Sequence, residues 1–416
     1  MQNIPKIQDA DLKGKIVLVR VDHNVVKKGQ IKDPYRIDAS LPTIRFIFEK
    51  GGKPILMTHV GRPRDKKTGK ITVSANTSVE PVVDYLNKEL NVKFEIAFDN
   101  KPDMKNKECI AELRSGKIDG IYLPNTRWFP GEEAGGEESR KFAKELAQLA
   151  DIFVNDAFGS WQPHASTVYI AEFLPSCAGI LMQKEIENLD KVLNPARPFV
   201  AVVAGSKFDT KIGPLTALLE MADFLVIGGV LYNAYLCAKY GIKIKSITDE
   251  DISAAHEFVE LTKKYPQKII ELPDVVESDL LNDKIQGKFR THSIYDLKAG
   301  TELNYVLDVA EKSFQTEKVK EIFASAKTIF VNAVMGLTPN FAEGTIALDS
   351  IINKNKQAQK LFGGGDTLQE FKTLLPDVYS KALEDNKYYF FTGGGTILKA
   401  IKEGSATGLG PIQALI

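Results

Sequence analysis

The sequence predicts an α/β protein built from two doubly wound parallel-sheet domains that face a cleft and are joined by a long helix. The first observation is that apolar runs of strand length alternate with stretches of helical periodicity along all 416 residues. The second is that the two halves end their strands differently: Asp22-His23-Asn24 follows an apolar run in the first half, and Gly363-Gly364-Gly365 follows one in the second. The length also exceeds one ordinary core, which favours two domains.

The two kinds of strand end indicate two kinds of binding. Open parallel sheets bind ligands at the carboxyl ends of their strands. Ionic side chains at those ends suit a small anion, whereas glycines let phosphate groups approach bare backbone amides. Two such halves facing each other suggest phosphoryl transfer between a nucleotide and a small acid.

The elements of the first half follow one another in strand, helix, strand order. A strand is expected at 15–21, and the next helix is expected to begin at Ser40, with Pro42 as a start signal, and to end at Gly51-Gly52. Further strands are expected at 54–58, 121–123 and 152–154, with helical faces at Val82, Val83, Leu86 and Leu90 and at Phe142, Leu146 and Leu149. This order predicts a mostly parallel sheet.

A long amphipathic helix at 182–193, with Ile186, Leu189 and Leu193 inward, is expected to connect the domains. Beyond it, strands are expected at 199–203, 223–227, 268–272, 328–332, 359–362 and 388–391. We therefore divide the chain into an N-terminal domain at 1–181, a connecting helix and hinge at 182–198, a C-terminal domain at 199–403, and a tail at 404–416 that is expected to pack back on the N-terminal domain.

Composition narrows the class of protein. The 54 basic and 54 acidic residues cancel, which argues against nucleic acid or an anionic membrane as a partner. No apolar run reaches the ~18 residues of a membrane span, and the N-terminus lacks the apolar run of a signal peptide. Three widely spaced cysteines, Cys109, Cys177 and Cys237, have neither disulfide nor zinc-ligand spacing and are expected to be buried. A reducing cytoplasm fits best.

The common nucleotide motifs are missing. A P-loop needs Gly-Lys followed by Ser or Thr, and no Gly-Lys pair of this chain continues that way. No G-x-G-x-x-G is present either. A simple P-loop NTPase and a dinucleotide oxidoreductase are therefore disfavoured.

Six motifs occur in an order that resembles the phosphoglycerate kinase family over nearly the whole chain. They are Arg36-Ile37-Asp38 with Leu41–Ile44, Thr58–Pro63, Asn125–Glu133, Asn155–Gly159, Gly363–Thr367 and Thr392–Gly395. Met182–Ile186 also matches the connecting helix of that family. The resemblance implies reversible phosphoryl transfer between the acyl phosphate of 1,3-bisphosphoglycerate and ADP, giving 3-phosphoglycerate and ATP, in glycolysis and gluconeogenesis.

By this resemblance, the first domain binds the phosphoglycerate. Asp22 and Asn24 match positions that bind its hydroxyl and carboxyl end. The positions that bind its anionic groups are matched by Arg36, His59, Arg62, Arg127 and His164. Planar guanidinium groups bind phosphate and carboxylate oxygens in pairs, so several around one anion fix its position. The plainer alternatives are a surface ion pair for each arginine and a hydrogen-bonded core histidine for His59.

By the same resemblance, the second domain binds the nucleotide. The matching positions are Gly205, Lys207, Lys211, Asn332, Gly364, Asp366, Thr367 and Gly394. Asp366 would touch a Mg²⁺ ion that comes with ATP or ADP, and Thr367 would cap the following helix. Arg36 and Lys207 are the expected catalytic residues, because a loose transition state needs charge neutralisation rather than a nucleophile. The plainer alternative for each glycine run is a tight turn.

The chain departs from the family pattern on the acid side. The loop after Gly159 is one residue short, and Gln162 stands near the place of a phosphoglycerate-binding arginine. Losing one charge-assisted hydrogen bond costs on the order of 1.5–3 kcal/mol. We expect weaker binding of the acid, although Trp161 is placed to shape the pocket.

Three departures concern the nucleotide side. Pro339 replaces the glutamate that binds the ribose hydroxyls, with Glu343 four residues further on as a possible substitute. Phe208 is a bulky residue expected beside the nucleotide pocket, and Val230 stands in place of the third glycine of a triplet, which narrows access to the backbone. These changes leave two alternatives open: a family member with altered nucleotide or acyl-phosphate preference, and a non-catalytic binding homologue. In either case small molecules are the expected partners of a monomer.

Overall fold

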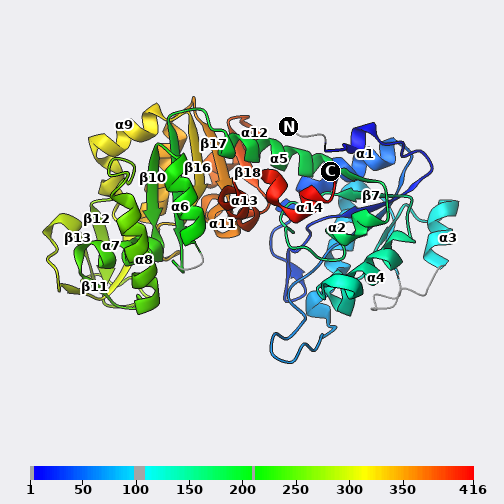
Figure 1. The fold of residues 1–416 in the computed structure, drawn as a ribbon, viewed down its shortest axis with the longest axis horizontal. Coiled ribbons are helices and arrows are strands. Elements are labelled where there is room, and N and C mark those ends of the chain that lie inside the picture. Colours follow the sequence, from blue (N-terminus) through cyan, green and yellow to red (C-terminus); the bar gives the residue numbers. More distant parts are fainter. Residues whose placement is uncertain (1–3, 98–107, 209–210) are drawn as a thin grey trace. The chain divides into compact units, whose positions relative to one another are not determined.

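The structure, a computed structural model, describes residues 4–97, 108–208 and 211–416 (Figure 1). The chain divides into two compact units. The first consists of Met1–Glu187 together with Ser405–Ile416, and the second is Asn188–Gly404. The C-terminal segment therefore belongs to the first unit, and helix α5 (Ile180–Leu193) contains the division between the two.

The first unit is built on a six-stranded parallel sheet. Its strand order is β5-β6-β4-β1-β7-β8. The strands are β1 (Ile16–Arg20), β4 (Lys53–Met57), β5 (Phe94–Ile96), β6 (Gly120–Tyr122), β7 (Ile152–Asn155) and β8 (Ser176–Ala178). Every neighbouring pair is parallel, as the alternation of strands and helices predicts. Parallel pairing places the carboxyl ends of all six strands at one edge.

The helices of this unit are α1 (Tyr35–Glu49), α2 (Glu80–Leu90), α3 (Glu108–Ser115), α4 (Gly136–Ala147) and the short C-terminal α14 (Gly410–Gln413). A small hairpin of β2 (Val26–Lys27) and β3 (Gln30–Ile31) follows the first strand. Strand β1, at the centre of this sheet, has covered faces: all five of its residues are buried, and the first four, Ile16 to Val19, are apolar.

The start of helix α1 corrects the sequence-based expectation. The helix begins at Tyr35 rather than Ser40, because Asp33 Oδ1 accepts a hydrogen bond from the Tyr35 N–H and Pro34 precedes the first turn. Pro42 therefore lies inside the helix. Ser40 is buried, and its hydroxyl lies 2.8 Å from His23 Nε2. The hydroxyl of Ser40, which was expected to cap the helix, instead makes a hydrogen bond in the interior.

The second unit is built on a five-stranded parallel sheet of order β10-β9-β16-β17-β18. Its strands are β9 (Phe199–Gly205), β10 (Phe224–Gly228), β16 (Thr328–Asn332), β17 (Gln359–Gly363) and β18 (Tyr388–Phe391), all paired in parallel. Two helix groups cover it. Helices α6 (Ile212–Met221), α7 (Gly229–Tyr240), α8 (Asp249–Thr262) and α13 (Gly394–Glu403) contact one another, and so do α9 (Glu317–Ser325), α10 (Glu343–Lys354), α11 (Gly365–Leu374) and α12 (Pro376–Glu384). This is the expected doubly wound arrangement.

Three findings in the second unit differ from the expectation. No strand forms at 268–272, where only Ile269 makes an isolated parallel bridge to Leu225. A three-stranded antiparallel sheet of order β13-β12-β15 was not anticipated; it comprises β12 (Asp274–Ser278), β13 (Phe289–Ser293) and β15 (Tyr305–Val309). A short parallel pair was not expected either: β11 (Lys243–Ile244), which follows α7 in sequence, pairs with the distant β14 (Glu302–Leu303).

The prediction of buried cysteines without disulfide bonds is confirmed. All three cysteines are free and buried, and burial raises the pKa of each thiol. Among the described residues, no helix is both long enough and apolar enough to span a membrane.

Candidate active site

Four neighbouring strands of the first unit end in polar loops at the same edge. In the order β6-β4-β1-β7, the residues that follow them include Arg127, His59, Asn24 and the loop 159–164. These segments line a common cavity of ≈ 580 Å³. Its lining consists of Asn24, His59, Arg62, Arg64, Lys66, Arg127, Glu133, Gly159, Ser160, Trp161, Gln162 and His164. Five of the seven expected acid-binding residues therefore meet here.

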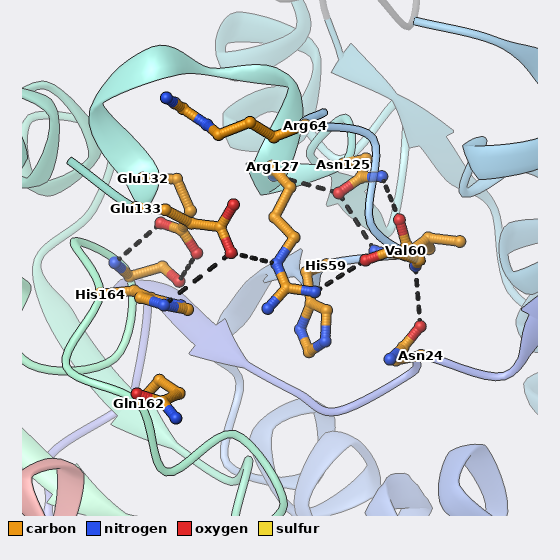
Figure 2. Close-up of polar contacts among 12 residues, drawn as sticks. Asn24, His59, Val60, Arg64, Asn125, Arg127, Glu132, Glu133, Gln162 and His164 are labelled. Carbon is orange, nitrogen blue, oxygen red and sulfur yellow. Dashed lines mark hydrogen bonds and ion pairs between the residues drawn. The ribbon is translucent and has the colours of Figure 1, made fainter. Parts of the chain in front are cut away.

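Asn125 joins two of the strand-end loops (Figure 2). Its Oδ1 accepts hydrogen bonds from the N–H groups of Val60 and Arg127, each at 3.1 Å. Its amide nitrogen donates to the carbonyls of Val60 and Thr77, at 2.8 and 2.9 Å. With all its hydrogen-bonding capacity used, the buried Asn125 fixes the backbone from which His59 and Arg127 project.

Arg127 already has partners inside the cavity. Its Nη1 donates to the Gly61 carbonyl at 2.7 Å, and its Nε lies 2.8 Å from Glu133 Oε1. Glu133 Oε1 is also 3.9 Å from His164 Nε2. A carboxylate thus stands beside the cationic side chains of this cavity, and the Nε of Arg127, although close to Glu133, has no hydrogen-bond partner among the described residues.

His59 is neutral in the folded protein. Arg20 Nη2 lies 3.0 Å from His59 Nδ1, and since an arginine only donates, Nδ1 accepts and the proton is on Nε2. Burial lowers the pKa of His59 well below its usual value, and the charge of Arg20 lowers it further. His59 is therefore a hydrogen-bonded, buried histidine that lines the cavity as a neutral donor.

Arg20 is a buried neighbour of His59 that was not among the residues expected from the sequence. It is fully buried at the end of β1, and its Nε donates to Ser166 Oγ at 2.8 Å. Ser166 in turn donates to the buried Glu132 at 2.6 Å. The signal in the sequence was an arginine within an apolar run, Val19-Arg20-Val21. A buried arginine of this kind requires a paired carboxylate nearby.

Asp22 and Arg36 form an ion pair of their own. Arg36 Nη1 lies 3.2 Å from Asp22 Oδ2. Asp22 is 4% exposed, and its Oδ1 has no hydrogen-bond partner within the described part of the chain. An orphaned carboxylate oxygen is a ready acceptor for a ligand hydroxyl. Neither residue lines the ≈ 580 Å³ cavity itself.

In the second unit, the expected nucleotide-binding residues surround Asn332 at the end of β16. Lys211 Nζ donates to the Ala204 carbonyl at 2.6 Å and to Asn332 Oδ1 at 3.2 Å. Asn332 Nδ2 donates to the Gly363 carbonyl at 2.6 Å. Burial lowers the pKa of Lys211, whereas the charge of Asp366 raises it. Strands β9, β16 and β17 are thereby tied together at their carboxyl ends.

The glycines of this unit are required by close packing. A Cβ on Gly394 would lie 2.5 Å from the Gly364 Cα, and one on Gly205 would lie 2.8 Å from Lys211 Cε. Gly364 also has a φ of 116°, which disfavours any other residue. The loops are thus close-packed glycine turns whose helices, α11 and α13, begin at the same edge of the sheet.

A cavity of ≈ 420 Å³ adjoins these turns. Apolar side chains such as Val230, Leu307 and Met335 line its interior. Gly205, Asp366 and Glu370 also belong to its lining. Its size and its combination of apolar walls with few polar groups are those of a small-ligand site. Lys207 is exposed beside it, at the end of β9, and is not part of the lining.

Two expectations on this side are wrong. Thr367 does not cap α11: the cap position is Gly364, and the buried Thr367 lies within the first turn. Phe208 does not crowd the cavity. It is fully buried, packs edge-on against Phe258 at 5.8 Å between ring centroids, and is absent from the lining. Its backbone N–H is held by Asp251 at 2.7 Å, which turns the ring into the core.

Glu343 is placed away from the ≈ 420 Å³ cavity. It begins α10, and its carboxylate is paired with Lys284. It lines a different cavity beside α9 and α10. The structure therefore gives no support to Glu343 as the replacement for the missing ribose acid.

Comparisons with known proteins agree with one another. The sequence model of the family described as phosphoglycerate kinase matches residues 7–404. The phosphoglycerate kinases of Dictyoglomus turgidum and Pseudothermotoga lettingae are 35% and 36% identical, over 99% and 95% of each chain. The solved phosphoglycerate kinase of Coxiella burnetii superimposes with a TM-score of 0.77 at 30% identity, over 99% of this chain and 98% of that one.

Two parallel sheets with these strand-end sites place the molecule among α/β transferases of the kinase class. The chain belongs to the phosphoglycerate kinase family. Its activity is phosphoglycerate kinase activity, a step of glycolysis, and it uses a nucleotide and small-molecule substrates.

Proposed function

We propose that the first unit binds 3-phosphoglycerate and the second binds ATP or ADP with Mg²⁺, and that the phosphoryl group moves reversibly between the nucleotide and the acid's carboxylate. The cation-lined ≈ 580 Å³ cavity of the first unit carries the proposal. A doubly anionic phosphate and a carboxylate need several fixed donors, and Arg62, Arg127, the neutral His59 and Asn24 surround one space.

Asp22 and Arg36 would bind the end of the acid at which the phosphoryl group is transferred. The unpartnered Asp22 Oδ1 would accept a hydrogen bond from the substrate hydroxyl. Arg36, already aligned by Asp22 Oδ2, would place its remaining N–H groups at the transferring phosphoryl group. Charge that is fixed in advance stabilises a transition state without reorganisation.

The second unit would hold the nucleotide with its phosphates at the glycine turns and its base in the apolar ≈ 420 Å³ cavity. Helices α11 and α13 begin at that edge, and the N–H groups of a helix's first turn have no partner within their own helix. Lys211 holds the turn after β9 by its bond to Asn332, and the exposed Lys207 would contact the transferring group from this side.

Asp366 fits the metal that the reaction implies. It is exposed in the first turn of α11, lines the cavity, and its charge already acts on Lys211. Mg²⁺ takes few protein carboxylates and completes its shell with phosphate oxygens and water. When bound, the ion would neutralise charge on the phosphates; Asp366 would hold it directly or through water.

The reaction requires that both substrates meet, so we propose closing motions of the two units that also exclude water. We further propose that the protein acts as a cytoplasmic monomer, the location being that of glycolysis. No nucleophilic side chain is needed, because a loose phosphoryl transition state requires positioning and charge.

Amide hydrogen exchange on the full chain tests the placement of the substrates. We expect 3-phosphoglycerate alone to protect peptides covering residues 58–64, 125–133 and 159–165. Mg-ADP alone should protect peptides covering 205–207, 332–336 and 364–367, and helix α8 serves as an internal reference. Protection of the second unit by 3-phosphoglycerate, or of neither unit by either ligand, would refute the assignment.

A further inference from the structure

Two positions of the ≈ 580 Å³ cavity in the first unit offer less positive charge than expected. Gln162 is exposed on the loop after Gly159, and its side chain brings no charge to the lining. Arg127 is shared with Glu133 and with the Gly61 carbonyl. A substrate with a phosphate and a carboxylate would therefore meet fewer free charges on this side than an arginine at position 162 and an unshared Arg127 would provide.

The segment after His59 presents additional cations to the same cavity. Arg62, Arg64 and Lys66 all belong to the lining, although only Arg62 was expected there. Arg64 lies in an isolated bridge, and Lys66 lies at the start of the turn that follows it. An arginine–x–arginine–x–lysine pattern was thus the signal that the sequence offered, in Arg62-Pro63-Arg64-Asp65-Lys66.

This segment is held in a defined loop. Arg64 pairs with Ile71 in an antiparallel bridge, and the Thr72 N–H donates to the Pro63 carbonyl at 3.0 Å. Asp65 Oδ1 closes the turn by accepting from the N–H groups of Lys67 and Thr68, at 3.0 and 2.7 Å. A loop fixed at its base and at its turn keeps residues 64 and 66 on the cavity side.

The guanidinium group of Arg64 has a hydrogen-bond partner at one nitrogen and none at another among the described residues. Its Nη2 donates to the Pro130 carbonyl at 2.9 Å, whereas its Nε is buried with no hydrogen-bond partner among the described residues. In the view of Figure 2, Arg64 and Gln162 lie on opposite sides of Arg127. Buried donors without partners are rare in folded proteins, and a bound anion would satisfy this one.

We infer that Arg64 and Lys66 are anion-binding residues of this chain, which supply from the loop 62–72 the charge that Gln162 does not supply from the loop 159–164. The inference rests on the proposed binding of 3-phosphoglycerate in the first unit. Arg64 makes the stronger contact because its guanidinium group is positioned by Pro130, whereas Lys66 adds a solvent-screened charge at the rim.

Calorimetric titration of the full chain with 3-phosphoglycerate tests this inference. Arg64→Gln should weaken binding about tenfold or more, the cost of a charge-assisted hydrogen bond. Lys66→Gln should weaken it about two- to fivefold. Lys67→Gln is the matched control: Lys67 lies in the same turn, is exposed and does not line the cavity, so its substitution should change the dissociation constant less than about twofold.

Two further variants separate charge from folding. Arg64→Lys should bind with intermediate affinity, since it keeps the charge without the planar donor pair. Gln162→Arg should tighten binding by up to ~10-fold and should restore much of the affinity lost in Arg64→Gln. Both effects should shrink as salt rises, because they are electrostatic.

The results distinguish this inference from the proposed function. If the wild type binds 3-phosphoglycerate and Arg64→Gln behaves like Lys67→Gln, the role of Arg64 is wrong and the substrate placement stands. If the wild type does not bind 3-phosphoglycerate, the placement is wrong. The same titration with inorganic phosphate then decides the loop's role: weaker binding in Arg64→Gln supports it, and unchanged binding overturns it.

Discussion

At the scale of single residues, the side chains of the candidate site are held by partners that hydrophobic patterns do not reveal. Arg36 and Asp22 were expected from their motif, and the structure pairs them at 3.2 Å. Arg20, Glu132 and Ser166 were not expected, yet their chain of hydrogen bonds holds His59 neutral and in one tautomer. Buried ionic partners come from distant parts of the chain, so their pairing is decided by tertiary packing.

Arg36→Ala should lose most of the turnover rate, about 10²-fold or more, with little change in nucleotide affinity. Its charge is needed at the transferring group, and its removal takes away an interaction made in the transition state. Steady-state kinetics and nucleotide titration provide the two readouts. Arg45→Ala, an exposed arginine on the same helix α1, should leave both unchanged. Near-normal turnover in Arg36→Ala would reduce the Asp22–Arg36 pair to a structural ion pair.

At the scale of elements, the ends of the parallel strands were predictable from the sequence, whereas the antiparallel sheet and the irregular segment 268–272 were not. The parallel strands of both units lie where apolar runs end in polar or glycine loops. The β13-β12-β15 sheet escaped detection because its strands mix apolar with charged residues, as in Phe289-Arg290-Thr291-His292-Ser293. The expected strand at 268–272 was wrong for the opposite reason, since an apolar run there makes only one bridge.

The segment between β16 and α10 should give little discrimination between ribose and deoxyribose nucleotides. Pro339 offers no side-chain acceptor, and Glu343 is engaged by Lys284. We expect calorimetry to give dissociation constants for Mg-ADP and its 2′-deoxy form within about threefold, and Glu343→Gln to leave their ratio unchanged. A strong preference for ribose that disappears in Glu343→Gln would restore that residue's role. Its disappearance in Glu370→Gln instead would assign the role to the carboxylate that lines the cavity with Asp366.

Asp156 links the end of β7 to helix α5 and should make stability depend on pH. Its Oδ1 accepts from the Met182 N–H at 3.1 Å, and burial raises its pKa from 3.8 to about 7. The folded state then binds more protons than the unfolded state between these values. The contribution of Asp156 to stability therefore falls as pH rises through this window and stays low above it.

Asp156→Asn removes this titration. The free energy of unfolding of Asp156→Asn minus that of the wild type should increase from pH 5 to pH 8, because only the wild type loses stability over this range; urea denaturation at several pH values measures it. The exposed Asp84→Asn on helix α2 should show no such trend. A pH-independent difference for Asp156→Asn would mean that the carboxyl is ionised throughout.

At the scale of the whole molecule, the two units divide the chemistry. The first carries cations around a cavity, and the second carries glycine turns around Asn332 and Lys211. The class of fold was predictable from the sequence, and most of the expected site residues lie where parallel strands end at a shared edge; their roles stay predictions. The loop 62–72, the inward turn of Phe208 and the pairing of Glu343 were not, because each depends on contacts between segments distant in sequence.

A coupled assay of the purified protein tests the central claim most directly. We predict turnover that requires 3-phosphoglycerate, a nucleoside triphosphate and Mg²⁺ together. The Michaelis constant for 3-phosphoglycerate should be lower in Gln162→Arg than in the wild type. Turnover only with a different carboxylic acid would mean that the loop 159–164 is built for another acyl phosphate. Binding of both ligands without any transfer would contradict the account, because it would make the chain a non-catalytic member of the family.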